Sequence, residues 1–310
     1  MNLVIFDPLA EDYKRHLEPL FPEMVIFAST DEKEVGGFIQ EADILFTGKI
    51  SDESIRKSTR LQWIQAKTAG VDYLLNLPSL GREVVITSTR GIHGPQMSEM
   101  AILLMLALNR NFPQNVRNQD QRVWDRWPGR LLYQKKVGIL GIGTIGEEIA
   151  RKCKAFSMTV LGFDIIKRNV DAVDFFYEPD QLCQILPELD YFIVVVPLTA
   201  ETRGMIDARV LSAMKPTAFF INIGRGKIVD DSALIQALQT GKIAGAALDT
   251  FWTEPLPENH PFWEMKNVII TPHIGGISDI YVEQVLPIFE ENLRRFLRGE
   301  RSSLINLVQP

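Results

Sequence analysis

Three side chains in the second half of the chain have the chemistry needed to bind a carboxylic acid and transfer a proton. Arg225 lies between two glycines, Glu254 lies in the turn TEPLP, and His273 lies in the loop TPHIGG. A guanidinium can hold a carboxylate in bidentate fashion. A histidine gives or takes a proton near neutral pH, and a neighbouring carboxylate stabilises the imidazolium. This set suits reduction of a 2-oxo acid, or oxidation of a 2-hydroxy acid.

Each of these residues follows an apolar run of strand length. The runs cover residues 218–223, 244–248 and 268–270, and a further run at 191–196 precedes Pro197. Continuous apolar strands are typical of parallel sheets that are covered on both faces. Ligands of such sheets bind beyond the carboxyl ends of the strands. We therefore expect the three side chains to lie at one edge of one sheet.

Taken one at a time, these residues have simpler interpretations. Arg225 could pair with a surface acid, and Glu254 could be a solvated loop residue. Among the other histidines, His260 in NHPFW is expected to anchor a loop, whereas His93 in GIHGP could face the site. His273 is the stronger candidate, because it lies in a Pro-His-x-Gly-Gly loop directly after a strand.

A glycine-rich turn indicates what else binds at this sheet. Gly141, Gly143 and Gly146 have the spacing G-x-G-x-x-G between an apolar run at 137–140 and a helical pattern, and Asp164 follows Gly146 by 18 residues. This is the context of a dinucleotide-binding turn, in which the pyrophosphate lies at the helix N-terminus. A purely structural strand–turn–helix unit is the alternative. The carboxylate of Asp164 would bind ribose hydroxyls and repel a 2′-phosphate, so NAD is expected rather than NADP, although Lys167 and Arg168 could weaken that preference.

Length and composition limit the class of protein. The chain has 310 residues, which predicts two domains, and a net charge of −6, which argues against a nucleic-acid surface. Cys153 and Cys183 are neither a disulfide framework nor spaced as metal ligands. The N-terminus lacks the features of a signal peptide, and the most apolar helical pattern, 97–108, is too short to span a bilayer. We expect a cytoplasmic protein that binds no metal, membrane or nucleic acid.

The first part of the chain predicts a second α/β unit. Five short apolar runs alternate with helical patterns over residues 1 to about 93, without a glycine fingerprint. After the fourth run, the stretch KTAGVDY could present backbone N–H groups to an anion, or could be a plain turn. The next helix, 94–109, is apolar on nearly all sides and is expected to be buried within the fold or against another subunit. The polar stretch that follows, with Trp124 and Trp127, is either an arm that docks on a partner or a surface helix.

Several longer motifs resemble the D-isomer-specific 2-hydroxyacid dehydrogenase family. They are VGILGIGTIGEEIA, VPLTAETRGMI, FFINIGRGKIVDDSALIQAL, AALDTFWTEPLP and VIITPHIGG, which cover about residues 137–276 in the family's order. The resemblance implies that Arg225, Glu254 and His273 are catalytic, with Arg225 and His273 also contacting the substrate. It further implies substrate contacts in the first part of the chain at Ala69, Gly70 and Val71. Beyond the three glycines, the cofactor contacts that it implies are Thr144, Ile145, Asp164, Pro197, Thr202, Ile223 and Asp249.

The expected fold is α/β, with two doubly wound parallel-sheet domains. A Rossmann NAD-binding domain should span 95–279, and a smaller flavodoxin-like substrate domain should combine 1–94 with 280–310. The resemblance places the active site in the cleft between them and implies a homodimer. The hypothesis is NADH-dependent, reversible reduction of a 2-oxo acid to a D-2-hydroxy acid.

Other functions stay open at this point. The motif GPQMSEMA and Trp252 depart from the commoner family pattern near the expected site, which leaves the size of the substrate open. The alternatives are a glyoxylate, hydroxypyruvate or phosphoglycerate type of dehydrogenase, and a non-catalytic NAD-sensing protein related to the transcriptional corepressors that share this fold.

Overall fold

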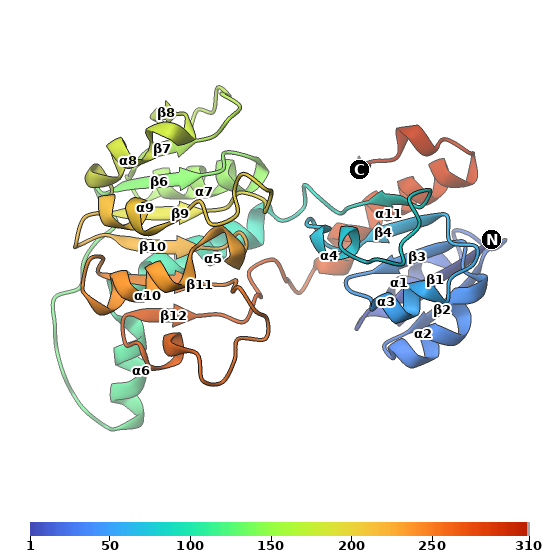
Figure 1. Ribbon diagram of the computed structural model, residues 1–310, viewed down its shortest axis with the longest axis horizontal. Helices are drawn as coiled ribbons and strands as arrows, with labels where there is room; N and C mark the ends of the chain where they lie inside the picture. The colour runs from blue at the N-terminus through green and yellow to red at the C-terminus, as the bar shows by residue number, and fades with distance from the viewer. Residues whose placement is uncertain (309–310) are drawn as a thin grey trace. The chain divides into compact units, whose positions relative to one another are not determined.

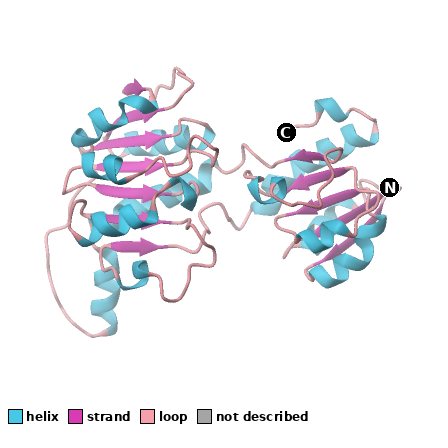
Figure 2. Ribbon diagram, viewed as in Figure 1, coloured by secondary structure: helices cyan, strands magenta, loops and turns pink. Residues whose placement is uncertain are grey.

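The computed structural model describes residues 1–308 and divides into two compact units. The first unit combines Met1–Ile92 with the segment from Ser278 onward, and the second unit is His93–Ile277. Each unit has one parallel sheet with helices on both faces (Figures 1 and 2). The predicted fold class is therefore confirmed.

The first unit has a five-stranded sheet of order β2-β1-β3-β4-β5. Its strands are β1 (Asn2–Phe6), β2 (Val25–Ser29), β3 (Ile44–Thr47), β4 (Trp63–Ala66) and β5 (Val85–Thr87), and every pairing is parallel. Its helices are α1 (Ala10–Leu17), α2 (Glu32–Phe38), α3 (Asp52–Arg56), α4 (Asp72–Leu75) and α11 (Tyr281–Leu297), with short 3₁₀ helices at Ile39–Glu41 and Arg301–Ser303. The strand order reverses between β1 and β3, as in flavodoxin-like sheets.

Helix α11, near the end of the chain, belongs to this first unit. Its apolar residues recur every three or four positions and face the sheet together with α1. Phe289 stacks on Phe46 of β3 with ring centroids 4.7 Å apart, and buried Asn292 donates from Nδ2 to Gln65 Oε1 of β4 at 3.0 Å. These contacts tie the C-terminal helix to the N-terminal sheet.

The second unit has a seven-stranded sheet of order β12-β11-β10-β9-β6-β7-β8. Its strands, all paired in parallel, are β6 (Lys136–Leu140), β7 (Thr159–Phe163), β8 (Phe175–Tyr177), β9 (Tyr191–Val194), β10 (Phe219–Asn222), β11 (Gly245–Leu248) and β12 (Val268–Ile270). Its helices are α5 (Gly94–Asn109), α6 (Phe112–Asp120), α7 (Thr144–Ala155), α8 (Leu182–Ile185), α9 (Ala208–Ala213) and α10 (Asp231–Gln239), with 3₁₀ helices at Pro179–Gln181, Leu186–Glu188, Gly226–Ile228 and Pro261–Glu264. The order reverses between β6 and β9, which is the Rossmann arrangement.

Alternate residues of these strands build two separate cores. In β10, Phe220 faces the core formed with α9 and α10, whereas Phe219 and Ile221 face the core formed with α5 and α7. The strands are apolar throughout because both faces of the sheet are covered. Among residues 1–308, no helix is both long enough and apolar enough to cross a membrane.

Two details bear on the sequence expectations. Strand β8 was not predicted, because its three residues give too short a signal. Helix α5 is not buried on all sides within the chain, since Leu103 is 57% exposed, so burial against another subunit stays a prediction.

Candidate active site

The turn after β6 has the shape that a dinucleotide requires. Gly141 has a φ of +103°, which favours glycine. A Cβ on Gly146 would lie 1.9 Å from the carbonyl oxygen of Gly141, so α7 approaches the strand as closely as glycine allows. The position of a Cβ on Gly143 is open, with no atom within 4 Å, which leaves room for a pyrophosphate against the backbone. Thr144 and Ile145 form the first turn of α7, whose N–H groups and dipole favour an anion.

Asp164 lies immediately after β7, and its carboxylate is fixed beside this turn. Oδ2 accepts from the N–H of Ile142 at 2.7 Å, and Oδ1 accepts from the N–H of Ile166 at 3.0 Å. Each oxygen keeps a second lone pair that a ribose hydroxyl can use. The residues of the turn therefore fit a dinucleotide.

The remaining predicted cofactor residues follow neighbouring strands. Thr202 donates from Oγ1 to the carbonyl of Pro197 at 2.7 Å, which closes the loop after β9. Ile223 follows β10, and its N–H donates to the carbonyl of Val194 at 3.1 Å. Asp249 follows β11 and is almost fully buried. All of them lie beyond the carboxyl ends of the strands of the Rossmann sheet, at the edge where the glycine turn lies.

Arg225 is presented by a turn that a buried asparagine holds. Asn222, the last residue of β10, accepts from the N–H of Gly224 at 3.1 Å and donates from Nδ2 to the carbonyl of Arg225 at 3.1 Å. The guanidinium of Arg225 donates from Nη1 to the carbonyl of Gly224 at 2.8 Å. Sequence reasoning overlooked Asn222, although an amide at the end of the apolar run FFIN was a usable signal.

Glu254 and His273 are in direct contact. His273 Nδ1 lies 2.7 Å from Glu254 Oε2, and Glu254 Oε1 accepts from the N–H of Phe251 at 2.9 Å. Burial raises the pKa of Glu254, but the hydrogen bonds from His273 and Phe251 and the charge of Arg225 outweigh it and hold the pKa below its usual value. Glu254 is therefore ionised at neutral pH and can stabilise a positive charge on the imidazole.

The turns that carry Arg225 and Glu254 pack directly against each other. A Cβ on Gly226 would lie 1.9 Å from the carbonyl carbon of Phe251, so the turn after Arg225 packs directly on the turn before Glu254. The indole N–H of Trp252 donates to the carbonyl of Val229, which joins the same two turns a second time. The structure thus fixes Arg225 and Glu254 to each other through their main chains.

The other histidines differ in their surroundings. His93 precedes α5 and is buried beside the loop of His273, since a Cβ on Gly276 would lie 3.3 Å from its Cδ2. Burial, and secondarily the charge of Arg225, lowers the pKa of His93 to about 4. His260 anchors a loop as expected, because its ring accepts from the N–H of Phe262 at 3.4 Å.

The turn that is predicted to bind the substrate carboxylate lies in the first unit, after β4. Thr68 donates from Oγ1 to the carbonyl of Gly70 at 2.7 Å, and the turn Ala69–Val71 leads into α4. The neighbouring Lys67 ammonium is paired with both oxygens of buried Asp7, at 2.7 and 3.0 Å. Lys67 is therefore not a free cation.

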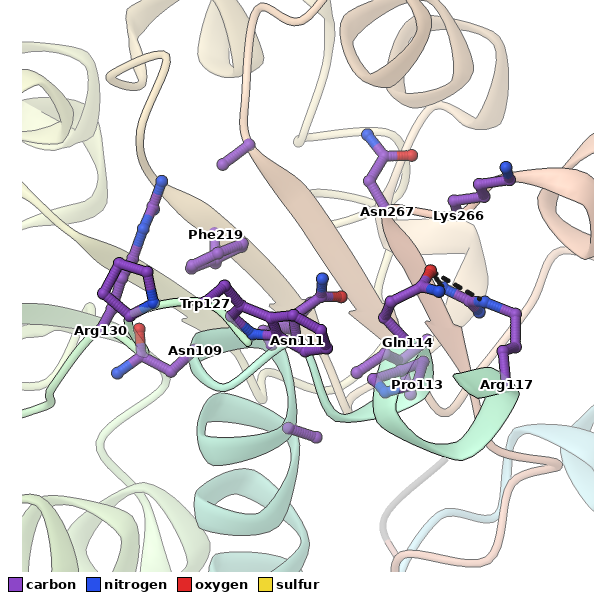
Figure 3. Close-up of a pocket in the computed structure, with 15 residues that line it drawn as sticks. Asn109, Asn111, Pro113, Gln114, Arg117, Trp127, Arg130, Phe219, Lys266 and Asn267 are labelled. Atoms are coloured by element: carbon purple, nitrogen blue, oxygen red, sulfur yellow. Dashed lines mark hydrogen bonds between the residues drawn. The ribbon is translucent and has the colours of Figure 1, made fainter. Parts of the chain in front are cut away.

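A cavity of about 390 Å³ lies elsewhere in the second unit (Figure 3). Its lining includes Phe219, Ala244 and Asn267, which lie at the amino ends of β10, β11 and β12, together with side chains of α6 such as Arg117. This is the sheet edge opposite to the glycine turn, so the cavity is not part of the candidate active site.

Comparison with known proteins places the chain in a family. A sequence profile of the D-isomer specific 2-hydroxyacid dehydrogenase family, NAD binding domain, matches residues 102–275. The chain is 34% identical over 274 residues to glyoxylate reductase of Pyrococcus furiosus, which covers 84% of this chain and 81% of that protein. The chain belongs to the D-isomer specific 2-hydroxyacid dehydrogenase family of oxidoreductases.

Other relatives differ in length and bound cofactor. D-3-phosphoglycerate dehydrogenase of Methanocaldococcus jannaschii is 31% identical over 97% of this chain, which spans 58% of that protein's length. A solved family protein from Aeromonas salmonicida is 34% identical, with a TM-score of 0.90 over 99% of this chain and 98% of that one. A second solved member, from Xanthobacter autotrophicus, was crystallised with NADPH and MES; it is 28% identical, with a TM-score of 0.82 over 100% of this chain and 98% of that one.

Proposed function

We propose that the protein reversibly reduces a 2-oxo acid to the D-2-hydroxy acid with NADH. The observation that carries this proposal is the contact of 2.7 Å between His273 and Glu254, at the same sheet edge as Arg225 and the glycine turn. When bound, the dihydronicotinamide supplies the hydride. Arg225 holds the substrate carboxylate, and His273 gives its proton to the carbonyl oxygen as the carbonyl carbon is reduced. In the reverse direction, neutral His273 takes the proton from the hydroxyl group.

Glu254 acts through His273. As an ionised carboxylate it stabilises the imidazolium, and its hydrogen bond to Nδ1 leaves Nε2 as the nitrogen that faces the substrate. The backbone N–H groups of the Ala69–Val71 turn are proposed to complete the recognition of the carboxylate. Because Lys67 is paired with Asp7, this turn does not gain a free cation from it, which favours a small 2-oxo acid over a phosphorylated one.

NAD is the proposed cofactor. The fixed carboxylate of Asp164 suits ribose hydroxyls and would repel a 2′-phosphate. Relatives that bind NADPH make this preference a direct question for experiment. Oxidation of NADH and of NADPH should be compared with the same substrates: glyoxylate, hydroxypyruvate, pyruvate and 3-phosphohydroxypyruvate. A clear preference for NADPH would refute the cofactor proposal.

The decisive variant is His273→Ala. We expect a fall in kcat of roughly 10²- to 10⁴-fold with glyoxylate, the usual contribution of general acid–base catalysis, and nearly unchanged affinity for NADH. His16→Ala is the matched control, because His16 is an exposed histidine bound to Glu290 in the first unit. Near-normal turnover of His273→Ala would refute the catalytic assignment.

We further propose a cytoplasmic homodimer. Large apolar side chains are exposed along α5, α6 and the segment after them, including Leu103, Phe112, Trp124, Leu131 and Tyr133. Exposed apolar surface of this extent is typical of protein–protein interfaces. The free thiols of both cysteines suit a reducing compartment. Light scattering of the wild type and of Leu103→Glu tests the dimer, which the charge should weaken; a monomeric wild type would refute it.

A further inference from the structure

The loop that carries His273 is held by one buried carboxylate. Asp249 Oδ1 accepts from the hydroxyl of Thr271 at 2.6 Å and from the N–H of Ile274 at 3.1 Å, and Oδ2 accepts from the N–H of Gly275 at 3.0 Å. Asp249 is 1% exposed and directly follows β11, whereas the loop follows the neighbouring strand β12. The three donors come from both sides of His273, so the carboxylate spans the loop around it.

The backbone of His273 needs such support. Its φ is +55°, in the left-handed region that residues other than glycine rarely occupy. A backbone in this region persists where its surroundings determine it. The approach of the loop to Asp249 is also close, because a Cβ on Gly275 would lie 2.9 Å from Oδ2. The bonds to Asp249 therefore fix both the path of the loop and the conformation of His273.

We propose that Asp249 is a positioning residue that holds His273 Nδ1 against Glu254. This inference rests on the proposed function of His273 as the acid. The family resemblance implies instead that Asp249 contacts the cofactor. Both lone pairs of Oδ1 are already used by the loop, and Oδ2 uses one of its two for the N–H of Gly275. Loss of the carboxylate should thus lower the rate of proton transfer more than the affinity for NADH.

The chemistry of an amide makes Asp249→Asn informative. In the variant, the amide oxygen of Asn can keep the bonds to Thr271 and Ile274. The amide NH₂ group then faces the N–H of Gly275, so two donors oppose each other and that hydrogen bond is lost. Thr271→Val is a milder change that removes one donor and keeps the shape of the side chain. Thr271→Ser restores the hydroxyl. Thr240→Val is the matched control, because it removes a threonine hydroxyl bonded to a helix carbonyl at the end of α10, away from the site.

The experiment measures kcat and KM with glyoxylate, and NADH affinity by nicotinamide fluorescence. We expect kcat to fall about 10- to 100-fold in Asp249→Asn, because misplacement of a reacting group by about 1 Å can cost about 10²-fold. Thr271→Val should lose roughly 2- to 10-fold, the effect of one hydrogen bond. Thr271→Ser should recover most of that loss, and the dissociation constant of NADH should stay close to that of the wild type.

Two results would overturn the positioning role. One is weaker NADH binding by Asp249→Asn with normal kcat in Thr271→Val, which is the pattern of a cofactor contact. The other is a Thr271→Val variant whose kcat equals that of Thr240→Val. This comparison decides the question even if Asp249→Asn does not fold.

His273→Ala is measured in the same assays. If His273→Ala kept its turnover, the proposed function would fail, whereas an inactive His273→Ala with an unaffected Thr271→Val refutes the positioning role alone.

Discussion

Replacing Glu254 by glutamine should slow proton transfer at His273. The change keeps the size of the side chain but removes the negative charge, whose Oε2 lies 2.7 Å from His273 Nδ1. The imidazolium that forms when His273 takes the proton of the substrate hydroxyl then loses its stabilising partner. Oxidation of the 2-hydroxy acid should therefore be slower in Glu254→Gln than in the wild type.

The size of the effect follows from Coulomb's law and solvent exposure. Two unit charges about 4 Å apart interact by about 1 kcal/mol in water and about 4 kcal/mol at an effective dielectric constant of about 20. The side chains of His273 and Glu254 are 43% and 37% exposed, so screening by solvent brings the value toward the lower end. We expect a loss of about 1–2 kcal/mol, which is a roughly tenfold lower rate because about 1.4 kcal/mol corresponds to a factor of ten in rate.

The assay is kcat/KM for oxidation of glycolate, the product of glyoxylate reduction, at neutral pH, where Glu254 is ionised. Glu258→Gln is the matched control, since Glu258 is an exposed glutamate in the same loop. Its kcat/KM should equal that of the wild type. An unchanged kcat/KM in Glu254→Gln would show that Glu254 does not support the charge of His273.

Two further predictions concern stability. The pKa of His93 is lowered from 6.5 to about 4 by burial and by the charge of Arg225, so the unfolded chain binds more protons and stability falls as the pH drops through this window. Urea unfolding should show that the wild type loses roughly 2–3 kcal/mol more than His93→Gln between pH 7 and 4.5, and equal losses would contradict the burial of a neutral imidazole. Gly226→Ala should destabilise the protein by about 1–3 kcal/mol or more, because its Cβ would collide with the backbone of Phe251. Gly37→Ala, where a Cβ meets no atom within 4 Å, is the control in thermal unfolding, and equal melting temperatures would refute the close contact.

The sequence alone determined the elements and the order of the chemical groups. Buried parallel strands are continuous apolar runs, and the runs at 137–140, 191–196 and 268–270 became β6, β9 and β12 within a few residues. The glycine turn was equally readable, because its three glycines meet local steric demands. Signals of this kind act within a short stretch of chain, so no knowledge of the sheet order was needed.

The tertiary structure decided which groups support which others. Asn222 holds the turn of Arg225, Gly226 packs on Phe251, and Asp249 holds the loop of His273. The last two contacts join segments that follow different strands, and they exist because β10, β11 and β12 are neighbours in the sheet. Strand order is a property of the whole fold, and the hydrogen bonds of a buried carboxylate depend on which donors the neighbouring strand brings within 3 Å. The residue types could be read from the sequence, whereas the hydrogen bonds and close contacts between these residues form only when folding brings their strands together.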